Sequence, residues 1–285
     1  MKQTSQEFGA VRALAAVGDD YYGVVQSEDD AATLQRLRLE GSTFLFGPGE
    51  PLARFGVTDG PIALAANGPR DFVVGHTVQH TIARERYSSE MSDAYRRWLE
   101  EDMGAPAPPA PTGGTYYEHE VTVTRPSLLT VSGDSVSAAA LSGGALPDVC
   151  LEPIALRSTA DGYLLIATSS GRYGTESNIA DQVVMVSLGH DHVVEELHPI
   201  VVDLGHELHD VRAVETVGGG FVVAVRDGAG TRYFSTEKVG HVDPFEPDDS
   251  LRRFAQHDRL PVAGLANGWM VELGPGIYSV ENSDR

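Results

Sequence analysis

The apolar residues of this chain fall into short runs separated by polar turn segments. Five times, a run opens with Val or Pro, any residue, and Ala. A turn rich in Gly, Asp and Asn follows, and an aromatic residue then starts a second apolar run. Gly, Asn and Asp supply the tight backbone of hairpin turns, and runs rich in Val, Leu and aromatic residues form strands. The pattern predicts five β-hairpins, which open at Val11, Pro61, Pro153, Val211 and Pro261.

Two positions recur in all five predicted hairpins. The first run carries an alanine, at Ala13, Ala63, Ala155, Ala213 and Ala263. The second run starts with an aromatic side chain, at Tyr22, Phe72, Tyr163, Phe221 and Trp269. Further strand-like segments follow most hairpins, for example PLARFG from residue 51 and QVVMVSLG from residue 182. Each repeat therefore corresponds to about four antiparallel strands in about 50 residues.

Five such repeats with little helix resemble a five-bladed β-propeller. The resemblance covers nearly the whole chain, taken as one domain over residues 1–285, and rests on the repeat pattern alone, because no WD or kelch signature is present. A six-bladed ring, with residues 117–146 as the extra blade, and a pair of β-sandwiches are the alternatives. The repeat that begins at Pro261 is too short for an outer strand. We expect residues 3–9 to complete that blade, so that the N-terminus closes the ring.

The second repeat is lengthened by an insertion at residues 88–116. Its first part has acidic residues near the start and ends at Gly104, and it carries apolar residues at helical spacing. The segment APAPPAP follows and is expected to be extended and stiff. We predict a short helix, either as a surface decoration or as a lid over one end of the ring. In the second case Tyr95 and Trp98 would face a ligand.

Charge and targeting signals narrow the class of partner. The chain has 21 basic and 41 acidic residues, a net charge of −20, which repels nucleic-acid phosphates and anionic lipids. We therefore expect neither nucleic acid nor membrane as a partner. No apolar run approaches the roughly 18 residues of a membrane helix. The N-terminus lacks an apolar signal region, and Cys150 is the single cysteine. These features predict a cytoplasmic protein.

Candidate chemistry concentrates in the loops between repeats, which in a propeller line one mouth of the central channel. The loop DLGHELHDVRAV, from residue 203, has an unusually polar content, although Asp at a strand start also stabilises turns. The paired His-Asp dipeptides of two consecutive repeats and one glutamate are the candidate catalytic residues: His209, Asp210, His257, Asp258 and Glu152. Candidate substrate-binding residues are Asp59, His76, Arg12, Arg212 and Arg226, with Tyr95 and Trp98 from the insertion.

Three kinds of chemistry fit these residues. The first is an enzyme that uses acid/base groups on a small polar or natural-product-like molecule, by hydrolysis, elimination or isomerisation. Five-bladed propellers include arabinanase-like and invertase-like glycoside hydrolases, which use paired carboxylates. This chain resembles them in blade count only, so none of their catalytic residues is assigned here.

The second kind is a divalent metal site, with His76, His206, His209 and His257 as candidate ligands. No other cofactor is expected. The third is a non-catalytic propeller that binds a carbohydrate or another small ligand. Because the loops differ from repeat to repeat, one asymmetric site is favoured over an array of identical pockets. The substrate and the oligomeric state are left open by the sequence.

Overall fold

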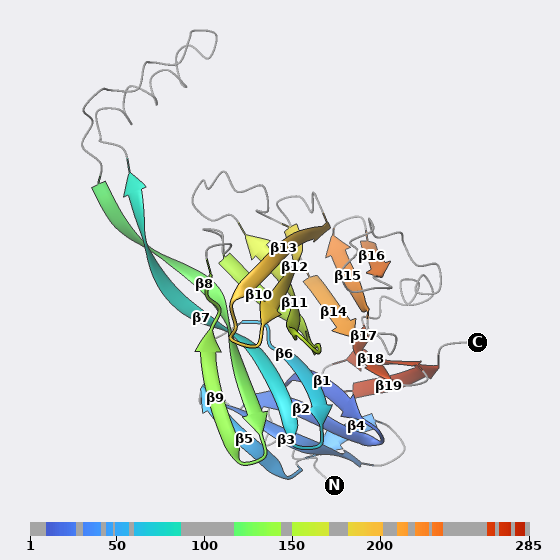
Figure 1. Ribbon diagram of the computed structural model, residues 1–285. Coiled ribbons are helices and arrows are strands. Elements are labelled where there is room, and N and C mark those ends of the chain that lie inside the picture. Colours follow the sequence, from blue (N-terminus) through green and yellow to red (C-terminus); the bar gives the residue numbers. More distant parts are fainter. Residues whose placement is uncertain are drawn as a thin grey trace. The chain divides into compact units, whose positions relative to one another are not determined.

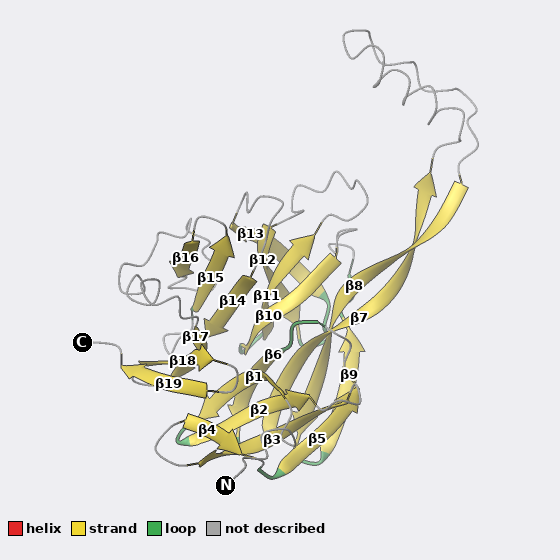
Figure 2. Ribbon diagram, turned by 180° about the vertical axis from the view of Figure 1, so that it is seen from behind, coloured by secondary structure: helices red, strands yellow, loops and turns green. Residues whose placement is uncertain are grey.

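The described part of the chain is entirely β-structure (Figures 1 and 2). The structure is a computed structural model that describes residues 10–26, 31–40, 44–47, 49–56, 60–86, 117–143, 150–170, 182–201, 210–215, 220–227, 230–235, 261–265, 268–274 and 277–282. These residues form 19 strands. Within these ranges no helix is long and apolar enough to cross a membrane.

The strands follow one another along the chain as antiparallel hairpin sheets. The first repeat contains β1 (Ala10–Val17), β2 (Asp20–Gln26), β3 (Ala31–Glu40), β4 (Phe44–Gly47) and β5 (Pro51–Gly56). The second contains β6 (Ala63–Gly68), β7 (Asp71–Arg86), β8 (Tyr117–Ser132) and β9 (Ser135–Ala140). The third contains β10 (Cys150–Ser158), β11 (Gly162–Ser170), β12 (Gln182–Gly189) and β13 (Val194–Val201). The fourth contains β14 (Asp210–Glu215), β15 (Phe221–Asp227) and β16 (Gly230–Ser235), and the last β17 (Pro261–Leu265), β18 (Gly268–Gly274) and β19 (Ile277–Asn282).

All five predicted hairpins are confirmed. β1 pairs with β2, β6 with β7, β10 with β11, β14 with β15 and β17 with β18, each in antiparallel register. In three of them the register shifts within the Val/Pro-x-Ala motif, at Val11/Ala13, Pro153/Ala155 and Pro261/Ala263. Such a shift is a β-bulge, in which the middle residue of the motif is extra. In these three hairpins the motif marks a bend at the start of the first strand, whereas β14 carries the motif in a register without a shift.

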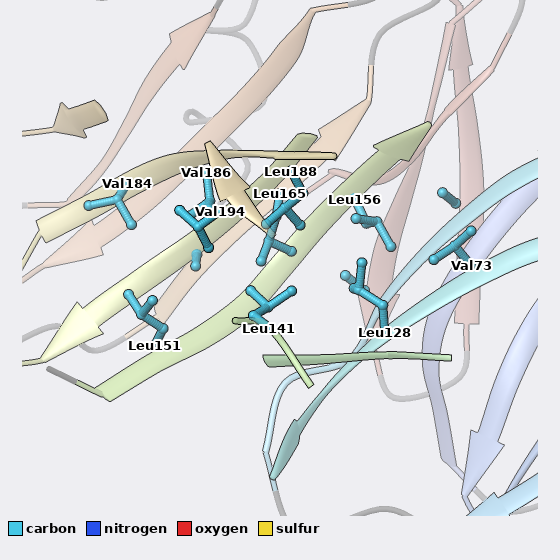
Figure 3. Close-up of a cluster of buried hydrophobic side chains, with 13 residues drawn as sticks. Val73, Leu128, Leu141, Leu151, Leu156, Leu165, Val184, Val186, Leu188 and Val194 are labelled. Carbon is cyan, nitrogen blue, oxygen red and sulfur yellow. The ribbon is translucent and has the colours of Figure 1, made fainter. Parts of the chain in front are cut away.

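Three of the recurring aromatic residues lie in the core. Tyr22, Phe72 and Phe221 are at most 2% exposed, and the rings of Tyr22 and Phe72 pack with their centroids 4.8 Å apart. Phe72 and Val74 belong to a cluster with residues of the first sheet, including Tyr22 and Val24. Val73, between them on the same strand, joins a different cluster with residues of the third sheet, such as Leu165 (Figure 3). The second sheet is thus apolar on both faces, as alternation along a strand requires.

The first strands of the repeats form a closed cycle of neighbours. β1 contacts β6, β6 contacts β10, β10 contacts β14, β14 contacts β17, and β17 contacts β1. A further apolar cluster, which includes Ile166 and Phe221, joins the third and fourth sheets. Among the described residues, the apolar clusters thus join the first sheet to the second, the second to the third and the third to the fourth.

The edge of the last sheet is occupied by β4. Ile277 of β19 is paired with Leu45, and Tyr278 with Phe44. β4 belongs to the first repeat and also pairs with β3, so one sheet joins the first and last repeats. The sequence pattern did not predict this strand. The segment expected at this edge, residues 3–9, lies outside the described residues.

Residues 79–123 form a compact unit separate from the rest of the chain. In it the structure describes only the far ends of β7 and β8, which are neighbours in the second sheet. The insertion thus joins the second and third strands of one sheet. The helix predicted within residues 88–116 lies outside the described residues, and so do Tyr95 and Trp98.

Replacing Phe72 by alanine tests whether the recurring aromatic position holds neighbouring sheets together. The ring is fully buried between the first and second sheets, so we expect the free energy of unfolding to fall by about 3–5 kcal/mol. The measurement is chemical denaturation followed by circular dichroism. The control is Val136→Ala, because Val136 is 49% exposed and its loss should change stability by less than about 0.5 kcal/mol. Equal effects of the two changes would contradict the packing scheme.

Candidate functional site at the start of the first strands

Three consecutive first strands begin at the same end of the cycle. The Arg12 guanidinium, at the start of β1, donates a hydrogen bond from Nη2 to the Gly60 carbonyl, just before β6, at 2.6 Å. Gly75 of β7 is paired with Ala63 near the start of β6. A Cβ atom on Gly75 would lie 3.4 Å from Cβ of Pro153, near the start of β10. The starts of β1, β6 and β10 are therefore adjacent.

The hairpin registers place polar residues at equivalent positions around this end. Glu152 is opposite Thr168, Asp210 is opposite Arg226, and Ala10 is opposite Gln26. In the second repeat, a Cβ atom on Gly60 would lie 2.5 Å from Oγ1 of Thr77. Gly60 and Thr77 are therefore adjacent at the corresponding place in that repeat. We call this set the polar rim, and it comprises Gln26, Thr77, Glu152, Thr168, Asp210 and Arg226.

Two acidic candidates thus stand at matching places on neighbouring strands. Glu152 is the residue before Pro153, and Asp210 is the residue before Val211, in β10 and β14 respectively. β10 and β14 contact each other. The side chain of Glu152 is half-buried. The backbone of Asp210 is paired with that of Arg226 in the hairpin of β14 and β15.

The two arginines at the motif's middle position differ in their surroundings. Arg12 lies at the bulge of β1, is exposed, and donates hydrogen bonds to Oε1 of Gln26 as well as to Gly60. It therefore links the first sheet to the second. Arg212 is half-buried on β14, directly opposite Ala224 in a register without a bulge. The bulge explains why the middle residue of the motif has different surroundings in the first and fourth repeats.

His76 lies beside the rim, on the face of β7 that carries Phe72 and Val74. It is 9% exposed, its ring centroid is 6.3 Å from that of Phe55, and its Nδ1 atom is buried without a hydrogen-bond partner. Burial lowers its pKa because the charged ring would lose hydration, while a hydrogen bond with the Thr77 backbone raises it less. The ring is therefore a neutral group in an apolar setting.

Of the residues at this end of the second strands, Arg226 was among the sequence candidates, whereas Gln26, Thr77 and Thr168 were not. The signal that could have found Gln26 and Thr168 is the Val/Pro-x-Ala motif, because the residue before the motif is paired with Gln26, Thr168 or Arg226 in the three registers.

The other candidates lie outside the described residues. They are Asp59, His206, His209, His257, Asp258, Tyr95 and Trp98. Three of the four candidate metal ligands are in this group. Among the residues with described positions, no group of three or more His, Cys, Asp or Glu side chains is arranged to hold a metal ion. The single cysteine, Cys150, is buried and accepts a hydrogen bond from the Thr124 backbone N–H at 3.5 Å.

A second buried histidine lies in the turn between β12 and β13. His192 has a positive φ of 64°, is 9% exposed, and has its ring centroid 5.6 Å from that of Tyr163. Its Nδ1 atom is buried without a hydrogen-bond partner, and burial lowers its pKa. The neighbouring Asp191 opposes that shift and His190 adds to it. The segment GHDH, residues 189–192, thus forms the hairpin turn between β12 and β13.

These features define the chain as an all-β protein of the propeller class with a polar rim at the start of its first strands. No family model and no curated protein matches the sequence. Solved structures with a related fold include the GH43 protein BlXynB from Bacillus licheniformis, with 11% identity and a TM-score of 0.44, where the match covers 87% of this chain and 43% of the other.

A second related structure is the exo-β-1,3-galactanase of Phanerochaete chrysosporium with galactose. It has 10% identity and a TM-score of 0.48, and the match covers 95% of this chain and 60% of the enzyme. A variant of the same galactanase with β-1,3-galactotriose gives 11% identity and a TM-score of 0.48, with 97% and 61% covered. The chain therefore spans less than two thirds of the length of these proteins.

The stability of the protein should fall as the pH drops below about 6.5, the ordinary pKa of histidine. Below this pH, residue 76 is protonated in the unfolded chain, whereas the buried ring stays neutral in the folded protein because its pKa is lowered. The unfolded state therefore gains stability relative to the folded state as the pH falls towards the folded-state pKa. We expect His76→Asn to show a shallower loss of stability between pH 7 and pH 5, in denaturation curves at fixed ionic strength.

The matched control is His198→Asn. His198 is 45% exposed and contacts Glu196, with 2.9 Å between its Nε2 and Oε2 of Glu196. This variant should keep the steep pH dependence of the parent protein. A His76→Asn variant with an unchanged slope would show that His76 does not resist protonation in the folded state.

Proposed function

We propose that the sheets form a five-bladed propeller whose polar rim binds a small, hydroxyl-rich molecule and acts on it by acid/base chemistry. The closed cycle of β1, β6, β10, β14 and β17 supports five blades, because each contacts two neighbours and β17 returns to β1. The observation that carries the site is the repeat equivalence of Glu152 and Asp210 on contacting strands.

Two carboxylates in this arrangement suit glycoside cleavage. One carboxylic acid protonates the leaving oxygen while the other carboxylate activates water, and inverting enzymes hold the two about 6.5–9.5 Å apart. Retaining enzymes hold the two only about 5 Å apart. β10 and β14 contact each other, so both acids belong to one end of adjacent strands, and the separation of their carboxylates decides between the two mechanisms.

The cross-strand partners of the two acids differ. Asp210 is paired with Arg226 in the backbone register, a residue type of opposite charge. Asp210 is therefore assigned the base that activates water. Glu152 is half-buried and faces Thr168 across the hairpin, which leaves it the acid role. Gln26 and Thr168 are half-buried and carry amide and hydroxyl groups of the kind that bind sugar hydroxyls.

The alternative is a propeller that binds the same class of ligand without turning it over. Arg12 supports this alternative, because its guanidinium links two sheets through hydrogen bonds to Gln26 and Gly60. A rim that is held in place in this way can bind a ligand without catalysing a reaction. In the catalytic propeller the carboxylates take part in a chemical step, whereas in the non-catalytic one they contribute only to binding.

A screen of small sugars and aryl glycosides, by thermal shift and by release of the aryl group, tests the proposal. With a substrate in hand, Glu152→Gln should lower kcat roughly 10²–10⁴-fold, because a neutral amide cannot donate the proton. Its melting temperature should stay close to that of the parent protein. Glu196→Gln is the control, because Glu196 is exposed on β13, and it should retain full turnover.

The outcomes separate the two functions. Binding of a sugar by the parent protein with no turnover of any glycoside would support the non-catalytic propeller. Turnover that survives Glu152→Gln would exclude Glu152 as the acid. No binding of any sugar or glycoside would contradict the proposed ligand class.

A further inference from the structure

The outer strand of the second sheet, β9, is exposed along its whole length. Its sequence is SVSAAA, and all six residues are exposed. On one side β9 pairs with β8, from Ser127↔Ala140 to Ser132↔Ser135. No described strand pairs with its other side. An edge of this kind presents a row of backbone donors and acceptors that another strand can use.

β9 lacks the features that protect the other outer strands of the described sheets. β5 begins with Pro51 and carries Arg54, β13 carries Glu195 and Glu196, and β16 carries Arg232. Charged side chains and proline on an edge oppose pairing with a further strand. β9 carries neither, in a chain in which 22% of residues are charged. It also includes Val136, which is 49% exposed.

Both ends of β9 are held in place. At its start, the N–H of Gly133 donates a hydrogen bond to the Arg70 carbonyl at 2.8 Å. After its end, Ser142 donates to the His192 carbonyl at 3.2 Å and accepts from the Val194 N–H at 2.8 Å. The strand is therefore already in its extended conformation, which reduces the ordering cost of binding a partner.

The hydrogen bonds of β9 show which backbone groups point outwards. The Leu141 N–H donates to the Pro126 carbonyl at 3.2 Å, and the Ala139 carbonyl accepts a hydrogen bond from Oγ of Ser127 at 3.3 Å. Because backbone groups alternate in direction along a strand, Ser135, Ser137 and Ala139 face β8. The N–H and C=O groups of Val136, Ala138 and Ala140 then face solvent.

We propose that this edge binds the same edge of a second copy of the chain, in an antiparallel pair centred on Ala138. Two-fold pairing sets Ala138 opposite its own counterpart and Val136 opposite Ala140, so the outward groups of both strands are satisfied. The edges are neutral, and antiparallel pairing keeps the two Asp134 residues at opposite ends. A basic peptide is the weaker candidate, because β9 offers no acid to select it.

The dimer is expected to be weak and salt-dependent. Six-residue pairing buries less than the roughly 1,200 Å² of a stable interface, and each copy carries a net charge of −20. Salt screens that repulsion, since the Debye length falls from about 8 Å at 0.15 M to about 3 Å at 1 M. Association should therefore strengthen with salt, whereas binding of a basic partner would weaken.

Sedimentation velocity of the full chain, from about 10 μM to 1 mM at both salt concentrations, tests the proposal. Ala138→Pro removes an outward N–H, which edge strands tolerate, and should weaken the dimer at least about tenfold while the melting temperature is kept. Ala138→Thr retains the N–H and should dimerise within about twofold of the parent protein. A chain that stays monomeric under all conditions, or a proline variant that dimerises like the parent, would overturn the proposal.

Cross-linking gives a second, independent readout of the register. Paired residues that exchange hydrogen bonds have Cα atoms about 5.5 Å apart, which is within the range for a disulfide. Ala138→Cys should therefore form an oxidised dimer, and the native Cys150 is buried and does not compete. Ala160→Cys, at an exposed turn position, is the control and should cross-link far more slowly. Equal rates for the two variants would exclude the proposed pairing.

Discussion

The structure depends on one packing constraint, which is that sheets with two apolar faces must be covered on both sides. Phe72 and Val74 project from β7 towards the first sheet, while Val73 projects from the same strand towards the third. Such a sheet cannot end a stack, because one apolar face would stay in water. A closed cycle of contacts, in which β17 meets β1, removes the problem for every sheet at once.

The same cycle explains why a repeated backbone can hold an asymmetric site. Each repeat brings the start of its first strand and the end of its second to the polar rim, through a register that a bulge sets in three hairpins. Gln26, Glu152 and Thr168 are only half-buried there, so the core constrains their identity less than that of the buried strand residues. Ala10, Glu152 and Asp210 occupy one position, and Gln26, Thr168 and Arg226 occupy its partner.

The hairpins could be predicted from sequence because their signals are local. Turn residues and an apolar run led by an aromatic residue are enough to place β10 and β11, for example. β4 could not be predicted, because its pairing with β19 joins residues more than 200 positions apart. Such a distant pairing produces no repeating pattern of apolar residues in the local sequence. The backbone positions of Glu152 and Asp210 follow from the motif that they directly precede, so their place at the starts of β10 and β14 could be read from the sequence. The burial of His76 could not, because it depends on Phe55 of another sheet.

Ligand binding at the polar rim, between Glu152 and Asp210, is the proposal on which the function rests. The most direct test is a crystal structure of the protein soaked with the glycoside that binds it best. We predict density for the sugar at the start of β10 and β14, with one carboxylate on each side of the glycosidic bond. A sugar bound elsewhere on the molecule, with the rim filled only by water, would contradict the account.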